Sequence, residues 1–182
     1  MEQPTFRRLH PVNGEDLLEW QRVFRGTQSF TFATEGRPPT DEDAMRMMRT
    51  LPDGRSQDDV HVFAIYAGES LCGSSFIMRG YPTPEIAYLV LLILTEAFQG
   101  QSLGSACVRQ AEELARSWRS SKLAAVVDSA NIRALNFWRR EGFLETQRRE
   151  LPGLIGEAIS IEKALSPNLS VERTDQSLLR SL

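Results

Sequence analysis

The alternation and spacing of apolar positions in the first part of the chain predict a strand followed by two helices. Thr5–Leu9 is expected to form a short first strand, and the apolar residues of Glu15 to Arg25 recur at near-helical spacing. Thr40 has the character of an N-cap and is followed by acidic residues, which predicts a second helix there. Between the helices, Thr27–Pro39 contains Gly36 and two prolines and is predicted to be a loop.

The middle of the chain predicts three consecutive strands. Val60–Ala67 and Leu71–Arg79 flank a glycine-containing turn and are typical of a hairpin. Glu85–Thr95 contains the longest apolar run of the chain, Ile86 to Leu94. That run is far shorter than the ~20 residues of a membrane helix. It is better interpreted as a strand buried on both faces.

The remaining pattern completes a mixed α/β domain of the α+β type. After a loop at Glu96–Gln101, the expected elements are a helix to about Trp118, a strand Leu123–Val127, a helix Asn131–Glu141 and two strands, Phe143–Arg149 and Ala158–Ile161. Gly142 is well placed to end the second of these helices. We expect one domain over residues 1–165. The polar segment 166–182 is either a loose tail, which we favour, or a short helix.

Composition and charge narrow the functional classes. The 182 residues are 41% hydrophobic and 25% charged, as in an ordinary globular domain, and the net charge is −3. Nucleic-acid binders usually carry a basic face, so we expect no nucleic-acid partner. Two cysteines, Cys72 and Cys107, are too few for a disulfide framework, and the first residues lack the apolar stretch of a signal peptide. These features predict a cytoplasmic protein without a membrane partner.

The most informative segment is the loop that follows the long buried strand and opens the next helix. A helix N-terminus presents unpaired backbone N–H groups and the positive end of the helix dipole, which suit phosphate oxygens. Gly100 and Gly104 permit close approach, while Gln101 and Ser102 offer side-chain hydrogen bonds. The alternative is a tight turn with incidental glycines, and loop composition alone does not decide between them.

Two motifs in this region resemble those of the GNAT superfamily of N-acetyltransferases. The family's pyrophosphate-binding pattern, Q/R-x-x-G-x-G/A, falls on Gln99, Ser102 and Gly104, with Ser102 in place of the first glycine. A second register over Gln101, Gly104 and Ala106 also fits. We prefer the first, because the sequence from Phe98 has the aromatic, glutamine and glycine that are common in the family.

The second motif follows at the expected distance along the chain. The segment resembles N-x-x-A-x-x-F-Y-x-x-x-G-F through Asn131, Ala134, Phe137, Trp138, Gly142 and Phe143. Alone, it is also explained by an amphipathic helix with a glycine cap. With both motifs in order, the chain is identified as a member of the GNAT superfamily over roughly Val60 to Ile161.

The resemblance implies a fold, a co-substrate and a reaction. The fold would be a mainly antiparallel sheet with helices on both faces and a splayed parallel pair, Glu85–Thr95 and Leu123–Val127. Acetyl-CoA would bind in the splay, and an amine of a small molecule or peptide would attack its thioester directly. Backbone or side-chain contacts to the cofactor are implied for Leu92, Ile93, Leu94, Gln99, Gly100, Gln101, Ser102, Leu103, Gly104, Ser105, Asn131 and Trp138.

The acid and base of the reaction are not evident from the sequence. Trp138 occupies the position of the family's general-acid tyrosine, and an indole N–H does not usefully protonate a thiolate. The candidates for a base are Glu85, then Tyr88, then Asp128. Each has a simpler interpretation: a surface charge at a strand end for Glu85, a core residue for Tyr88 and a helix cap for Asp128.

The acceptor pocket would be lined by the segment Thr27–Pro39. Phe30 and Phe32 would face the apolar part of an acceptor, and Glu35 its ammonium; the alternative is a loop held by two aromatic residues. His10 and His61 are isolated, so we expect no metal. The sequence leaves open a homodimer, a non-catalytic acyl-CoA-binding regulatory module and a transferase for a longer acyl-CoA.

Overall fold

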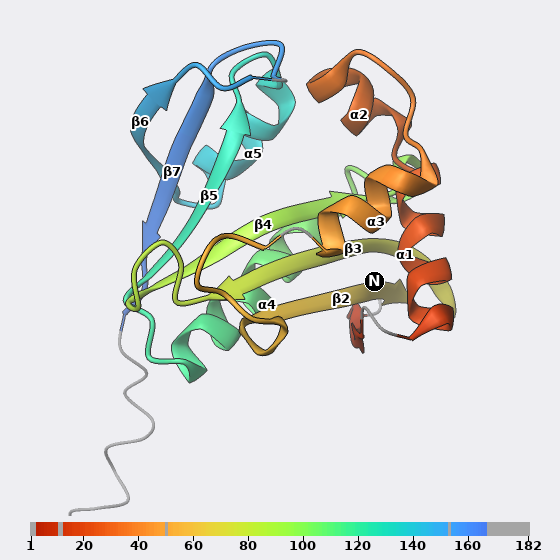
Figure 1. Ribbon diagram of the computed structural model, residues 1–182, viewed down its shortest axis with the longest axis horizontal. Helices are drawn as coiled ribbons and strands as arrows, with labels where there is room; N and C mark the ends of the chain where they lie inside the picture. The colour runs from red at the N-terminus through yellow and green to blue at the C-terminus, as the bar shows by residue number, and fades with distance from the viewer. Residues whose placement is uncertain (1–2, 11–12, 50, 153, 167–182) are drawn as a thin grey trace, which may run out of the picture.

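A seven-stranded sheet forms the centre of the protein. The computed structural model describes residues 3–10, 13–49, 51–152 and 154–166, and the side chains of residues 33–35 lie outside that description. The expectation for the tail therefore falls almost entirely outside the described residues. The strands lie in the order β1-β2-β3-β4-β5-β7-β6 (Figure 1). They are β1 (Thr5–Leu9), β2 (Val60–Ala67), β3 (Ser70–Arg79), β4 (Ile86–Leu94), β5 (Lys122–Asp128), β6 (Leu144–Arg149) and β7 (Ala158–Ala164).

One pair of neighbouring strands in the sheet is parallel, and these two strands pair over a short stretch only. All neighbouring strands are antiparallel except β4 and β5, which pair only from Ile86 opposite Lys122 to Tyr88 opposite Ala124. Beyond Tyr88, β4 continues along β3, whereas β5 stays paired with β7 over its full length. The mainly antiparallel sheet and the splayed parallel pair are thus both confirmed.

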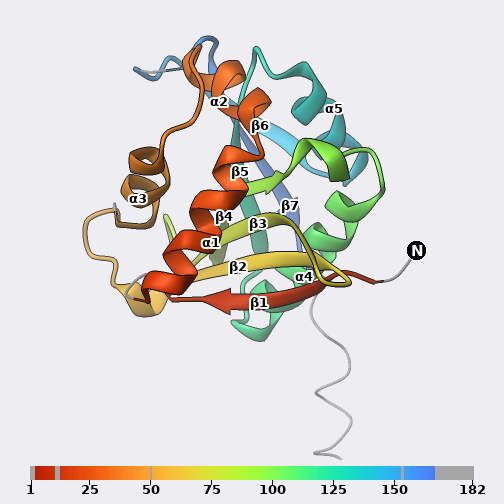
Figure 2. The same cartoon turned by 90° about the vertical axis from the view of Figure 1, so that its right-hand side faces the viewer.

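Helices cover both faces of the sheet, as predicted (Figure 2). On one face, α1 (Gly14–Arg25) and α3 (Asp41–Arg49) bury Trp20, Phe24 and Met48 against β2, β3 and β4. The indole N–H of Trp20 donates to the carbonyl of Ala44 at 2.8 Å and joins these helices. On the other face, α4 (Leu103–Ser117) and α5 (Ile132–Arg140) pack on β4, β5 and β7.

The segment Thr27–Pro39 was predicted to be a loop, and this is wrong for most of its length. Residues Gln28–Glu35 form helix α2. None of these residues is glycine or proline, so no breaker interrupts them. Gly36 ends the helix in the left-handed conformation with φ +69°, and its N–H donates to the carbonyl of Phe32 at 3.2 Å. The glycine and the prolines therefore terminate a helix here.

Thr40 begins helix α3 as predicted. The side-chain oxygen of Thr40 accepts from the backbone N–H of Asp43 at 3.2 Å, and a carboxylate oxygen of Asp43 accepts from the backbone N–H of Thr40 at 2.9 Å. This reciprocal pair is a capping box with aspartate as the acidic member. It also fixes the Asp43 carboxylate at the start of the helix, beside the cleft described next.

Candidate functional site

A cleft of about 710 Å³ opens where β4 and β5 part. One wall is formed by Leu89–Leu92 of β4 and another by Ala125–Asp128 of β5. Helix α5, with Pro152 and Leu154, closes one end through Asn131, Ala134 and Trp138. Helices α2 and α3 and the segment between them close the other end through Phe30, Arg37, Arg46 and Met47. A second cavity of about 250 Å³ adjoins this end, since both cavities are lined by Phe30, Arg46, Met47 and Val90.

The loop between β4 and α4 has the backbone geometry of an anion site. After a short 3-10 turn (Glu96–Phe98), Gly100 and Ser102 adopt φ of +78° and +63°. The first turn of α4 leaves backbone N–H groups unpaired within the helix. N–H groups at a helix N-terminus are of the kind that bind phosphate oxygens.

The two glutamines of this loop have backbone partners of their own. The side-chain amide of Gln99 donates to the carbonyl of Leu94 at 2.9 Å, and that of Gln101 donates to the carbonyl of Ala97 at 2.8 Å. Gln99 thus ties the loop to the end of β4, and Gln101 ties it to its own 3-10 turn. In this structure the backbone N–H groups, more than the glutamine amides, are what the loop offers to an anion.

The glycine at position 104 also allows helices α4 and α5 to pack closely, which the sequence did not reveal. A Cβ atom at this position would lie 2.9 Å from Cε2 of Phe137, on helix α5. The hydroxyl of the next residue, Ser105, donates to a carboxylate oxygen of Glu141 at 2.5 Å. The start of α4 is therefore packed directly against α5, and the two motifs of the sequence lie side by side.

Two of the residues implied for the cofactor line the α5 end of the cleft. Asn131 caps α5 by accepting the N–H of Ala134 at 3.0 Å. The ring of Trp138 stands edge-on to Phe137 and Phe143, with centroids 5.0 and 4.9 Å away. Trp138 is buried within this aromatic cluster and still lines the cleft.

The strand residues implied for the cofactor divide between three environments. Leu92 lines the cleft. Ile93 is buried in the core on the α1 and α3 side, and Leu94 packs in a small cluster with Leu103 and Cys107. Any contact of Ile93 or Leu94 with a ligand in the cleft would therefore involve the backbone.

The structure brings only one of the three candidate bases to the cleft. Asp128 lines it, but its carboxylate accepts three backbone N–H groups, from Ala130, Gly156 and Ile155 at 2.8, 3.0 and 3.1 Å. Glu85 and Tyr88 are not among the described residues that line the cleft.

The local surroundings of Glu85 and Tyr88 account for the direction in which the pKa of each is shifted. A hydrogen bond from its own backbone N–H, followed by one from Thr83, lowers the pKa of Glu85, whose side chain is exposed. Burial raises the pKa of Tyr88, whose ring stands edge-on to that of Tyr81 with centroids 5.3 Å apart.

The three acceptor candidates are likewise separated. Phe30 lines both cavities. Phe32, on the same helix, is 49% exposed and does not belong to the described lining. The side chain of Glu35 lies outside the described residues. Sequence reasoning missed Met47, Arg37 and Arg46, since nothing in the local pattern indicates which exposed side chains of the α2–α3 region face the sheet.

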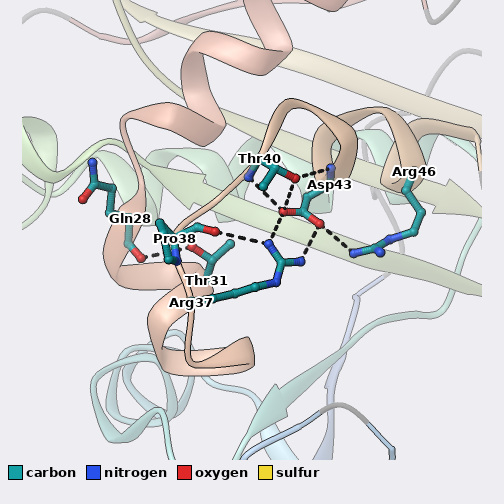
Figure 3. A network of polar contacts seen from close by, with 7 residues as sticks. All are labelled: Gln28, Thr31, Arg37, Pro38, Thr40, Asp43 and Arg46. Carbon is teal, nitrogen blue, oxygen red and sulfur yellow. Dashed lines mark hydrogen bonds and ion pairs between the residues drawn. The ribbon is translucent and has the colours of Figure 1, made fainter.

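A charged network stands at the α2–α3 end of the cleft (Figure 3). The guanidinium of Arg37 donates through both Nη atoms to the two carboxylate oxygens of Asp43, each at 2.7 Å. Arg46 donates to the same carboxylate at 2.8 Å. The hydrogen bond from Arg37, opposed in part by burial, holds the pKa of Asp43 well below its usual range.

Two further classes of site were sought in the described part of the chain. Within residues 3–10, 13–49, 51–152 and 154–166, no helix has the length and apolar character needed to cross a bilayer. In the same residues, no three histidine, cysteine, aspartate or glutamate side chains gather where they would hold a metal ion.

Comparison with known proteins points to one family. The sequence matches the model of the acetyltransferase (GNAT) family over residues 17–143. Among solved structures, an acetyltransferase from Thermus thermophilus superposes with a TM-score of 0.70 and 29% identity, covering 91% of this chain and 100% of that chain. No curated protein matches the sequence.

Two more distant solved structures share the fold. The ribosomal-protein-S18-alanine N-acetyltransferase from Escherichia coli has a TM-score of 0.66 and 14% identity, covering 91% of this chain and 96% of its own. A spermidine N-acetyltransferase from Vibrio cholerae, in complex with CoA and spermine, has a TM-score of 0.67 and 14% identity, covering 89% and 95%.

Proposed function

Because this chain belongs to the GNAT acetyltransferase family, we propose that it transfers the acetyl group of acetyl-CoA to a primary amine of a small molecule or peptide. The observation that carries the proposal is the cleft between β4 and β5, beside a helix N-terminus with anion-binding geometry. A structural neighbour of this fold is in complex with CoA, which supports an acyl-CoA co-substrate.

The co-substrate would run along the unpaired edge of β4. Since pairing with β5 ends at Tyr88, backbone groups from Leu89 onward face the cleft without a neighbouring strand on that side. The pantetheine arm would pair with this edge between Leu92 and Leu94 as an added strand. The pyrophosphate would accept hydrogen bonds from the N–H groups of Gly100 to Ser105, and Asn131 would contact the cofactor beside β5.

The reaction would be a direct displacement. The neutral amine nitrogen attacks the thioester carbonyl and the C–N bond forms; the nitrogen then loses one further proton to water, and the C–S bond breaks with CoA as the leaving thiolate. A backbone N–H near Leu92 would stabilise the developing oxyanion. An alkyl amine of pKa ~10.4 costs about 4–5 kcal/mol to deprotonate at pH 7. Holding amine and thioester together in the cleft offsets a cost of this size.

We assign the proton transfers to water. The carboxylate of Asp128 is engaged by three backbone N–H groups, and neither Glu85 nor Tyr88 lines the cleft. The ammonium proton would therefore leave through water in the open cleft. The CoA thiolate would recover a proton from water, because the indole of Trp138 is not a useful acid.

The test is calorimetric titration with acetyl-CoA and with free CoA, followed by thiol release with a broad panel of primary amines. We expect micromolar binding of both ligands and release of CoA that depends on the amine. A protein that binds neither ligand would contradict the proposal. Binding without thiol release from any amine would favour a non-catalytic acyl-CoA-binding module, the alternative that Trp138 supports.

A second alternative concerns the acyl group. The cleft lined by Leu92 and Trp138 would hold the acyl group together with the pantetheine arm and the acceptor, so its size does not select the acyl length. Comparing kcat/KM for acetyl-, butyryl- and octanoyl-CoA with one amine distinguishes the two substrates. Preference for the longer chains would replace acetyl-CoA as the co-substrate.

A further inference from the structure

Three residues spaced four apart form one row along helix α5 and its C-cap: Arg133, Phe137 and Glu141. Residues at this spacing are neighbours on the same face of a helix. The last two contact the first turn of α4. Glu141 accepts from the hydroxyl of Ser105 at 2.5 Å, and a Cβ atom at Gly104 would lie 2.9 Å from the ring of Phe137.

The row leads toward the N-terminus of α4. Glu141 meets the third residue of that helix and Phe137 meets the second. Arg133 is the next member of the row, about 6 Å further along the axis of α5. It therefore stands beside the loop that precedes α4, where the N–H groups from Gly100 onward form the proposed pyrophosphate site.

The positive charge of Arg133 has no evident role in stabilising the fold. The side chain is exposed, and among the described residues its guanidinium has no hydrogen bond or ion pair. Arg133 is the second residue of α5, where the positive end of the helix dipole disfavours a cation. The first turn of α5 contains no acidic residue that would offset this cost. The guanidinium is thus available to an anion that comes from outside the chain.

A cation at this point would also improve the start of α4 as a phosphate site. Glu141 brings a carboxylate to the first turn of α4 through its hydrogen bond with Ser105, and that negative charge would oppose a bound phosphate. The first turn of α4 itself contains no acidic residue. Arg133, on the other side of Phe137 in the row, supplies the opposite charge.

We propose that Arg133 binds a phosphate group of acyl-CoA, together with the backbone N–H groups of the loop. The proposal rests on the proposed function, because it names a residue that would hold the co-substrate of that reaction. A guanidinium can donate two parallel hydrogen bonds to phosphate oxygens. CoA has phosphate in two places, the pyrophosphate and the 3′-phosphate of its ribose, and both are remote from the thioester. Arg133 would therefore set the affinity for acyl-CoA and leave the chemical step unchanged.

The experiment measures the affinity of wild type and Arg133→Gln for CoA and for 3′-dephospho-CoA by calorimetry. Glutamine and arginine have similar helix propensities, so α5 should be retained. We expect about tenfold weaker binding of CoA, the size of a lost hydrogen bond to a charged group. A loss for CoA alone assigns the contact to the 3′-phosphate, and an equal loss for both ligands assigns it to the pyrophosphate. Unchanged affinity for CoA would overturn the proposal.

Two further measurements distinguish a phosphate contact from a structural effect. Arg133→Lys keeps the charge and should recover part of the lost affinity. The difference between wild type and Arg133→Gln should also shrink at 1 M salt, because exposed charges are screened. A loss that lysine does not reduce, accompanied by a lower melting temperature, would show that Arg133 only supports the fold.

The matched control is Arg140→Gln. Arg140 is an exposed arginine in the last turn of the same helix, about 10 Å along the axis from Arg133. We expect its affinity for CoA to stay within about twofold of the wild type, since its charge is a full Debye length away. An equal loss in Arg133→Gln and Arg140→Gln would reduce the effect to net charge and reject the specific contact.

The same titrations separate this inference from the proposed function. A wild-type protein that binds neither CoA nor acetyl-CoA would reject both. A wild-type protein that binds CoA and releases thiol, with Arg133→Gln binding CoA equally well, would reject the role of Arg133 alone. Weaker binding in Arg133→Gln supports that role even if no tested amine releases thiol.

Discussion

Gly104, at the start of helix α4, lies directly against the ring of Phe137 on helix α5. A Cβ atom at residue 104 would come within 2.9 Å of Cε2 of that ring. The glycine therefore serves two requirements at once: an open helix N-terminus and close packing of the two helices. A substitution at the motif glycine should consequently affect both ligand binding and stability.

Gly104→Asp should abolish acetyl-CoA binding, because it places a bulky negative charge at the proposed pyrophosphate site and against Phe137. Gly104→Ala is the control for packing alone, and we expect it to destabilise the fold by about 1–3 kcal/mol through overpacking. Calorimetry and urea unfolding measure the two effects. Unchanged acetyl-CoA affinity in Gly104→Asp would refute the motif register that includes Gln99, Ser102 and Gly104.

Trp138→Phe should retain most activity, because the indole packs edge-on between Phe137 and Phe143 and is assigned no proton transfer. We expect kcat within about fivefold of the wild type, equivalent to about 1 kcal/mol on the barrier. Steady-state kinetics and a thermal melt measure the outcome. A much larger loss of kcat in a folded variant would mean that the indole acts in the reaction.

Asp128→Asn distinguishes a turn-holding residue from a base. The amide oxygen still accepts backbone hydrogen bonds, so the turn around Ala130 and Gly156 should be weakened by about 1–2 kcal/mol and not lost. If water takes the amine proton, the pH profile of kcat keeps its shape. A fall in kcat of about 100-fold with a changed profile would identify Asp128 as the base.

Asp43→Asn should lower the free energy of unfolding at pH 7 by about 1–2 kcal/mol, an estimate reduced because both arginine partners are exposed to solvent. The control is Asp41→Asn, which removes an exposed partner of Arg25 and should change stability little. Urea unfolding of both variants at pH 7 measures the difference.

The difference in free energy of unfolding between the wild type and Asp43→Asn should depend on pH in a defined direction. The pKa of Asp43 is lower in the folded state than its unfolded value of about 3.9. Its contribution is therefore fully present well above pH 4 and is lost as the pH falls further, because the unfolded state binds the proton first. The gap between wild type and Asp43→Asn should narrow below pH 4. A constant gap would indicate that the carboxylate charge contributes nothing.

The strands and most helices follow from periodicity, because a residue buried on one face of a regular element repeats at a fixed interval. Val60–Ala67 shows this alternation in its burial, whereas Ile86–Leu94 was recognised as a strand from its uninterrupted apolar run. Helix α2 was missed because Gly36 and the following prolines were read as features of a loop, although a glycine in this position more simply ends a helix. The glycine and the prolines were correctly recognised as breaking regular structure, but the residues before them were assigned to the loop and not to a helix.

The candidate site was predictable only where function depends on the backbone. The loop proposed to bind the pyrophosphate has a sequence signature because glycines and a helix start are local properties. Arg37 and Arg46 both pair with Asp43, which is close to them in sequence. Whether these arginines line the cleft, and whether Tyr88 does, depends on how the helices and strands pack together. The packing of separate elements leaves no periodic trace in the sequence, which is why the arginines were missed and why the sequence alone did not separate Asp128, which lines the cleft, from Glu85 and Tyr88.

The brief pairing of β4 with β5 has a consequence for the protein's cohesion. The sheet consists of two antiparallel sections, β1 to β4 and β5 to β7. Only three residues of β4 pair with three residues of β5 to join them. A co-substrate that pairs with β4 and touches β5 would connect the two sections where the strands themselves do not pair. Ligand occupancy and folding would then be thermodynamically linked, and the protein would be held together in part by the molecule that it consumes.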